Sequence, residues 1–214
     1  MTNKYTGDMT RAEAKAKLAR LAERMGVRKT DIQVRSLSDD KNGMEIVVQV
    51  GGVRLARVCD SQDSGTANMV CLVLWLEDLV RNIERRIETV REAFYADGGH
   101  ALPADVDQFA QTAANLYTGE KTLDEARVMV QRASERLGLG VNDVQVRWNT
   151  QGATITFRLP SGQYVQKISN GQVDTRSNVV ALALWLQSRA KNFERGIERD
   201  LARLFAGNLL LTAG

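Results

Sequence analysis

The hydrophobic and polar positions of this chain follow one pattern that occurs twice. In each half, apolar residues at three-to-four spacing give way to three short runs typical of strands, and a second, longer helical pattern follows. The first half predicts helix termination at Gly26, strands at residues 31–35, 44–50 and 53–58, and a long helix at residues 67–94. The second half predicts helix termination at Gly138, strands at residues 143–147, 154–159 and 164–168, and a long helix at residues 177–205.

The residues repeat as well as the pattern. YTGDMTRAEA begins at Tyr5 and matches YTGEKTLDEA at Tyr117, an offset of 112, whereas Trp75 and Trp185 match at an offset of 110. Internal similarity of this extent indicates duplication. We therefore expect an α+β protein of tandem duplicated α-β-β-β-α units, related by a pseudo-two-fold axis. The expected first repeat covers residues 1–102, a linker covers 103–116, and the second repeat covers 117–214.

Several local signals support these helices. Thr10 and Glu13, like Thr122 and Glu125, have capping-box spacing at the start of a helix. The most apolar turns, MVCLVLWL and VVALALWL, are apolar on every side, so we expect them to be buried where the copies meet. Each of these runs is far shorter than the roughly 20 residues that span a bilayer. We expect no membrane crossing, and the absence of an apolar leader in MTNKYTGDMT predicts a cytoplasmic protein.

The second strand does not match between the two halves. Ile155, Phe157 and Leu159 alternate with polar residues, which predicts a half-buried strand, but MEIVVQV places its apolar residues at the opposite parity. Either the alignment gap is misplaced by one residue or the first sheet is covered on both faces.

Composition and charge narrow the classes of function only slightly. Apolar residues make up 43% of the chain, which excludes a disordered class, and the net charge of +3 permits an anionic partner without requiring one. Only two cysteines, Cys59 and Cys71, are present, so we expect buried thiols rather than a disulfide framework. His100 is the only histidine, and we expect a loop residue there. We expect no cofactor, no metal site and no catalytic residues.

The segment N-x-E-R-x-I-E occurs in both long helices. Glu84 and Glu88, like Glu194 and Glu198, are four residues apart and would share a helical face. Three interpretations remain open: a salt-bridged face, a polar contact across the pseudo-two-fold axis, or a catalytic or metal-binding pair. The first interpretation predicts an exposed ion pair at Glu88. We also expect the two long helices to pack together, with Trp75 and Trp185 close to each other in a shared core.

Basic and amide residues repeat on one predicted strand. Gln33 and Arg35, like Gln145 and Arg147, alternate with buried valines and would lie on the polar face of each sheet. Arg158 and Lys167 would join this face in the second copy, and Lys191, Arg195 and Arg199 would form a helical stripe. These nine residues are the candidate nucleic-acid-binding set. Before the long helix, the repeated pairs Gln62 and Asn68, and Gln172 and Asn178, are interpreted as helix caps.

Two resemblances follow from these residues. The tandem α-β-β-β-α order is similar to that of paired double-stranded-RNA-binding domains, although ANMV at Ala67 and SNVV at Ser177 stand where that family has a lysine cluster. Residues 59–103, which include LWLEDLVRNIERRI and ALP, resemble the segment that precedes the J domain in phage and bacterial proteins of unassigned function. This resemblance implies an origin in a phage or mobile element and carries no site residues with it.

The expected function is non-enzymatic nucleic-acid binding through the matched basic surfaces of the two repeats. Two rigidly held copies of a weak cationic surface would add their phosphate contacts. The alternative is a protein-interaction module that binds a host factor or a component of a defence system. Small-ligand binding ranks third. The sequence does not distinguish DNA from RNA as the partner, and it does not predict the oligomeric state.

Overall fold

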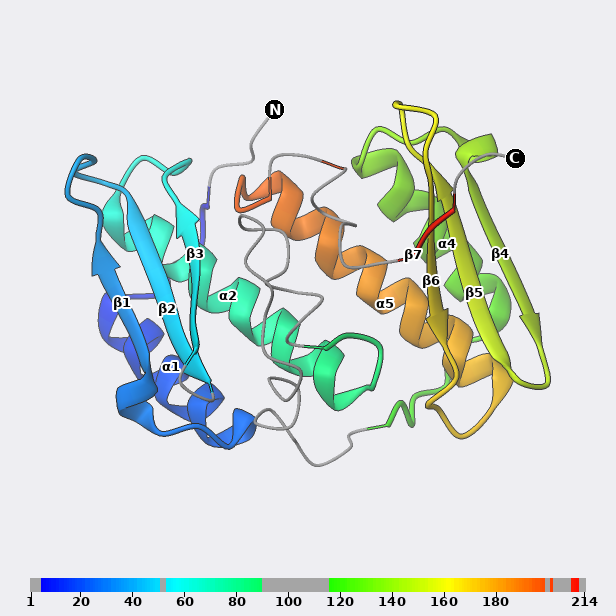
Figure 1. Cartoon of the computed structure of the whole chain (residues 1–214), viewed down its shortest axis with the longest axis horizontal. Coiled ribbons are helices and arrows are strands. Elements are labelled where there is room, and N and C mark those ends of the chain that lie inside the picture. The colour runs from blue at the N-terminus through cyan, green and yellow to red at the C-terminus, as the bar shows by residue number, and fades with distance from the viewer. Residues whose placement is uncertain (1–4, 51–52, 90–115, 199–200, 202–208, 212–214) are drawn as a thin grey trace.

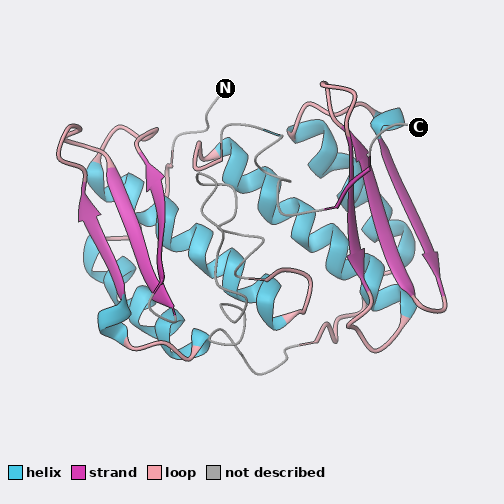
Figure 2. Cartoon of the chain, viewed as in Figure 1, coloured by secondary structure: helices cyan, strands magenta, loops and turns pink. Residues whose placement is uncertain are grey.

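In the described part of the chain, each half of this α+β protein has two α-helices and a small antiparallel sheet (Figures 1 and 2). The computed structural model describes residues 5–50, 53–89, 116–198, 201 and 209–211. The first unit contains α1 (Arg11–Met25), η1 (Lys29–Asp31), β1 (Ile32–Ser36), β2 (Met44–Val50), β3 (Val53–Cys59) and α2 (Gly65–Glu84). The second unit contains α4 (Leu123–Arg136), η4 (Val141–Asp143), β4 (Val144–Asn149), β5 (Gly152–Arg158), β6 (Tyr164–Ser169), α5 (Thr175–Glu194) and β7 (Leu209–Leu211). The predicted linker lies outside the described residues except for Leu116.

The strands pair in chain order as antiparallel neighbours, β1-β2-β3 in one sheet and β4-β5-β6-β7 in the other. The pairing explains the parity difference between the halves. Val34 lies opposite Ile46, and Val146 lies opposite Ile155. The two valines are 112 residues apart and the two isoleucines 109, so the gap in the sequence alignment is misplaced by one residue. Ile155, Phe157 and Leu159 are buried as predicted.

The sheets lie on opposite outer sides of the molecule, and α2 and α5 lie in contact between them (Figure 1). In the first unit, α2 packs against the sheet and α1 packs beside α2. In the second unit, α4 and α5 cover the inner face of the sheet. The contact between α2 and α5 confirms that the two long helices pack together.

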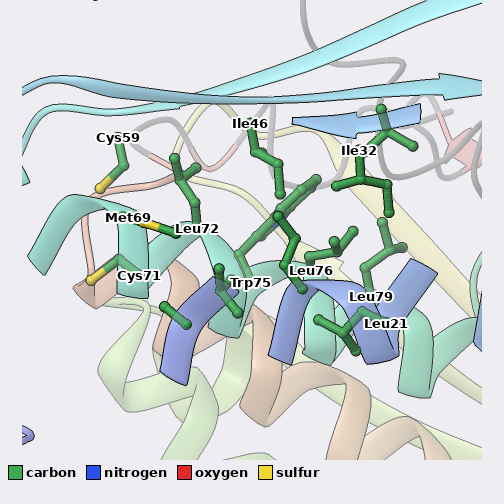
Figure 3. Close-up of a cluster of buried hydrophobic side chains, with 14 of the residues drawn as sticks. Leu21, Ile32, Ile46, Cys59, Met69, Cys71, Leu72, Trp75, Leu76 and Leu79 are labelled. Carbon is green, nitrogen blue, oxygen red and sulfur yellow. The ribbon is translucent and has the colours of Figure 1, made fainter. Parts of the chain in front are cut away.

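Each unit has its own apolar core. In the first, Leu72, Trp75 and Leu76 of α2 pack beneath Ile46 of β2, and Leu21 of α1 completes the cluster (Figure 3). In the second, Trp185 lies 6.2 Å from Phe157, measured between ring centroids. The predicted tryptophan pair in one shared core is therefore wrong. Each tryptophan belongs to the cluster of its own unit.

The starts of α1 and α4 agree with the sequence, whereas the ends of the long helices do not. Thr10 and Thr122 form the predicted capping boxes. However, α2 ends at Glu84 and α5 at Glu194, about ten residues before the predicted ends. Shortly after each end the chain takes a left-handed conformation, with φ of 56° at Arg86 and 71° at Gly196. Among the described residues, no helix is long and apolar enough to cross a membrane.

Candidate functional site

The first sheet exposes its predicted basic residues beside an acid. Gln33 and Arg35 are exposed on β1, as expected. Arg35 forms a 2.6 Å ion pair with Glu45 on the neighbouring strand, and Arg54 reaches the same carboxylate at 3.1 Å. Glu45 therefore offsets much of the positive charge that this face would present to a phosphate.

The second sheet lacks that acid. Gln145, Arg147 and Arg158 are exposed, and Arg147 donates a 3.2 Å hydrogen bond to the side chain of Gln145. Thr154 lies opposite Arg147, in the place that Glu45 takes opposite Arg35. None of the strands β4, β5 and β6 contains Asp or Glu. This face is therefore more basic than its counterpart.

The predicted exposure of Lys167 is wrong. Its side chain is 5% exposed, and its ammonium lies 5.7 Å from the centroid of the Trp185 ring. Arg57 takes the same place over Trp75, at 5.2 Å. Lys167 shares the inward face of β6 with Val165, so it packs as a cation over an aromatic ring and offers nothing to an outside ligand.

The predicted helical stripe of Lys191, Arg195 and Arg199 is also only partly exposed. Lys191 is exposed. Arg195 is partly buried and donates to Asp78 of α2 at 3.3 Å, so it contributes to the contact between units rather than to an open surface. Burial raises the pKa of Asp78, and the charge of Arg195 opposes that effect. Arg199 lies outside the described residues.

The repeated glutamines join the two units. Gln62 accepts a 2.6 Å hydrogen bond from the backbone amide of Tyr5 and donates to the carbonyl of Arg195 at 3.0 Å. Gln172 makes the reciprocal contacts, accepting from Tyr117 at 2.8 Å and donating to the carbonyl of Arg85 at 2.6 Å. Each glutamine thus satisfies a backbone carbonyl just beyond the end of the other unit's long helix.

The helix-cap interpretation of these residues is wrong. The N-caps are Ser64 and Asp174. Asn68 instead accepts from the amide of Gln62 at 3.0 Å, and Asn178 accepts from the amide of Gln172 at 3.2 Å. Each asparagine thereby positions the loop that carries the joining glutamine.

The isoleucines of the repeated segment cross between units. Ile87 follows the helix of the first unit but packs in the core cluster of the second, whereas Ile197 packs in the cluster of the first. The left-handed residue that precedes each isoleucine ends the helix and turns the chain toward the neighbouring unit. The two cores are therefore each completed by a side chain from the other half.

A buried polar cluster lies beside this crossing. Arg189 is 5% exposed and forms ion pairs with both Glu88 and Glu198, the latter at 2.9 Å between Nη1 and Oε1. Asn82 donates to Glu88 at 3.0 Å and to Ser188 at 3.1 Å. Burial lowers the pKa of Arg189, and the charge of Glu198 opposes that effect. The predicted exposed ion pair at Glu88 is wrong, because this carboxylate is itself only 5% exposed.

The other two glutamates of the segment hold the helices of their own units together. Arg24 of α1 donates to both carboxylate oxygens of Glu84, at 2.8 and 2.7 Å, and Arg136 of α4 binds Glu194 in the same bidentate manner. Because α2 ends at Glu84, that residue and Glu88 do not share a helical face. Among the described residues, no group of three or more His, Cys, Asp or Glu side chains could hold a metal ion.

The two thiols are buried, as predicted. Cys59 donates to the side chain of Asn68 at 3.1 Å. A hydrogen bond with Cys59 and burial raise the pKa of Cys71, which disfavours the nucleophilic thiolate.

Two matched grooves remain as open features of the surface. Each runs between the first helix of a unit and its first strand, with volumes of about 390 Å³ in the first unit and about 120 Å³ in the second. Six positions line both grooves at an offset of 112: Lys15 and Arg127, Leu18 and Val130, Ala19 and Gln131, Lys29 and Val141, Ile32 and Val144, and Val34 and Val146.

The strand beside each groove has an open edge. Among the described strands, β1 and β4 pair on one side only, with β2 and β5. An edge strand presents unpaired amide and carbonyl groups to an extended chain. A backbone edge next to an apolar groove can therefore hydrogen-bond a peptide and receive its side chains.

Sequence patterns alone do not identify these grooves. The apolar positions of the first helix and first strand have the spacing of core residues, so they predict burial. A groove forms only where the helix beside an edge strand leaves some of these apolar side chains uncovered.

The chain matches no family model, and no curated protein or solved structure was found to be similar to it.

Proposed function

We propose that this protein is a non-enzymatic protein-interaction module, built by duplication around a pseudo-two-fold axis, that binds extended segments at its two helix–strand grooves. The observation that carries the proposal is the set of six matched positions lining both grooves. The reciprocal contacts of Gln62 and Gln172 support the pseudo-symmetry.

The position of the grooves suits binding of two segments at once. The strands β1 and β4 lie at opposite ends of the molecule (Figure 1), so an occupant of one groove leaves the other accessible. The buried ion pair between Arg189 and Glu88 and the two glutamine hydrogen bonds join the units and favour a fixed spacing. A partner with two binding segments would gain affinity from their effective concentration.

The test uses the full chain and a displayed library of random peptides. Selected peptides are expected to shift the backbone amide NMR signals of β1 or β4. Ala19→Trp fills the first groove and is expected to abolish those shifts at β1, whereas Ala12→Trp, on an exposed face of the same helix away from the groove, leaves them unchanged. Selection of no peptide that reaches either edge strand would refute the proposal.

Nucleic-acid binding is the second candidate, supported by the outer face of the second sheet. Its strands carry Arg147 and Arg158 and no acid. Because the two sheets lie on opposite sides of the molecule, the binding would use this one face rather than the sum of two.

A mobility-shift assay at about 50 and 200 mM salt tests the second candidate, because phosphate contacts weaken steeply with salt. We expect a salt-sensitive shift that the double variant Arg147→Glu and Arg158→Glu removes. Arg35→Glu, on the opposite sheet, serves as the control. No shift at the lower salt concentration would exclude this candidate.

A further inference from the structure

We propose that the groove of the first unit takes an acidic extended peptide, which adds as a strand to the open edge of β1. This inference rests on the protein-interaction function proposed above and names the partner's chemistry for one of its two grooves.

The charges around the first groove carry the inference. Among the described residues, its polar lining consists of Lys15, Lys29 and Gln33 and includes no carboxylate. Lys15 is exposed and has no carboxylate partner among the described residues. Lys29 pairs with Glu23 at 2.8 Å, but both side chains are more than half exposed, so the pair is weak and a ligand carboxylate can replace it.

The second groove is less basic than the first. Val141 replaces Lys29 and is 68% exposed, and Glu135 lines the groove. Arg127, in the place of Lys15, is paired with Asp124 at 3.2 Å and lies 4.6 Å from the centroid of the Trp148 ring. An acidic peptide would thus meet one carboxylate and one cation in the lining of the second groove, whereas the described lining of the first presents two lysines and no carboxylate.

The open edge determines the form of the occupant. Backbone pairing with β1 requires an extended chain, whose alternate side chains face the groove. Leu18, Ile32 and Val34 supply apolar contacts within it. A peptide in which apolar and acidic side chains take turns among the groove-facing positions therefore places its apolar side chains against these residues and its carboxylates near the lysines.

A second copy of this chain is a poorer occupant than an acidic partner. Pairing of β1 with its counterpart in another molecule would bring Lys15 and Lys29 of both chains together, and like charges at a contact are unfavourable. Charge complementarity therefore favours a different, acidic chain.

The experiment titrates three synthetic peptides, SVTETVTES, SVTQTVTQS and SVTKTVTKS, into the isotope-labelled full chain. The acidic peptide is expected to shift the amide signals of β1 and α1, with an affinity about tenfold or more above that of the neutral peptide. Lys15→Glu is expected to remove that advantage, and Lys15→Gln to reduce it. Arg127→Glu, the matched change in the second unit, is expected to leave it intact.

Each alternative result has a definite meaning. Equal affinity for the three peptides, binding at β4 alone, or no binding of the acidic peptide overturns the acidic assignment. Concentration-dependent association of the unliganded chain through β1 also overturns it, because the occupant is then a second copy. The random-library selection separately decides the proposed function, since neutral peptides at either edge strand would sustain it while the acidic assignment fails.

Discussion

The side chain of Arg189 sets the energetics of the contact between the units. It is the cation between two buried carboxylates that arrive from the ends of both long helices. The residue 110 positions earlier is Leu79, so one arginine pairs with the glutamates of both repeated segments. A buried charge that loses its partner costs far more than a solvated one.

The first prediction follows because a single arginine pairs with two buried glutamates. Arg189→Ala is expected to lower the free energy of unfolding by about 3–5 kcal/mol, because it leaves two buried carboxylates without their cation. Glu88→Gln is expected to cost less, about 1–3 kcal/mol, since Glu198 still pairs with the arginine. Urea denaturation measures both values.

Arg136→Ala is the control for this series. Its ion pair with Glu194 is partly exposed, and a cost under about 1 kcal/mol is expected. A loss at Arg136 as large as that at Arg189 would contradict the assignment of the buried cluster as the stronger contact.

At the scale of the elements, the helix ends decide how the units meet. Gly196 has φ of 71°, a conformation that disfavours a side chain, and its amide donates to the carbonyl of Phe193 at 3.0 Å. The next residue, Ile197, donates to the carbonyl of Asn192 at 3.1 Å, which completes the turn that ends the helix.

Gly196→Ala is therefore expected to cost about 1–2 kcal/mol, the penalty of a left-handed residue that has a Cβ. Gly65→Ala is the matched control. That glycine lies at the start of α2, where an added methyl group would meet its neighbours only at ordinary van der Waals distance, and a change within about 0.5 kcal/mol is expected. Thermal unfolding compares the two, and equal losses would show that the turn does not depend on the glycine's conformation.

The elements with strong local patterns were predictable from the sequence. The strands and the capping boxes needed only alternation and the Thr-x-x-Glu spacing. The ends of the long helices were missed because apolar spacing continues past Ile87, and Arg86 gives no sign of a left-handed turn. Gly196 at the matched position was the available signal.

The candidate site was predictable only in part. Gln145, Arg147 and Arg158 were placed correctly on an exposed strand face. Lys167 was predicted to be exposed because of its charge, but the alternation of the strand places it on the same buried face as Val165. The crossing of Ile87 and the two grooves depend on distances between elements, which no local pattern contains.

For the whole molecule, the crossing side chains predict that a change at the end of one unit's long helix destabilises the core of the other unit. Ile197→Ala is expected to cost about 2–5 kcal/mol by leaving a cavity. Hydrogen exchange is expected to accelerate in α1 and α2, because the isoleucine packs in the first core. Val130→Ala, in the second core, is the control and should accelerate exchange in α4 first. Acceleration confined to α5 in the Ile197 variant would refute the crossing.

The exchange of Ile87 and Ile197 has the form of a domain swap contained within one chain. A polypeptide of half this length would leave its own isoleucine exposed and the matching socket empty. Two such polypeptides would fill each other's sockets, so a polypeptide of either half is expected to associate as a dimer. In the full chain, the covalent connection makes the same contact independent of protein concentration.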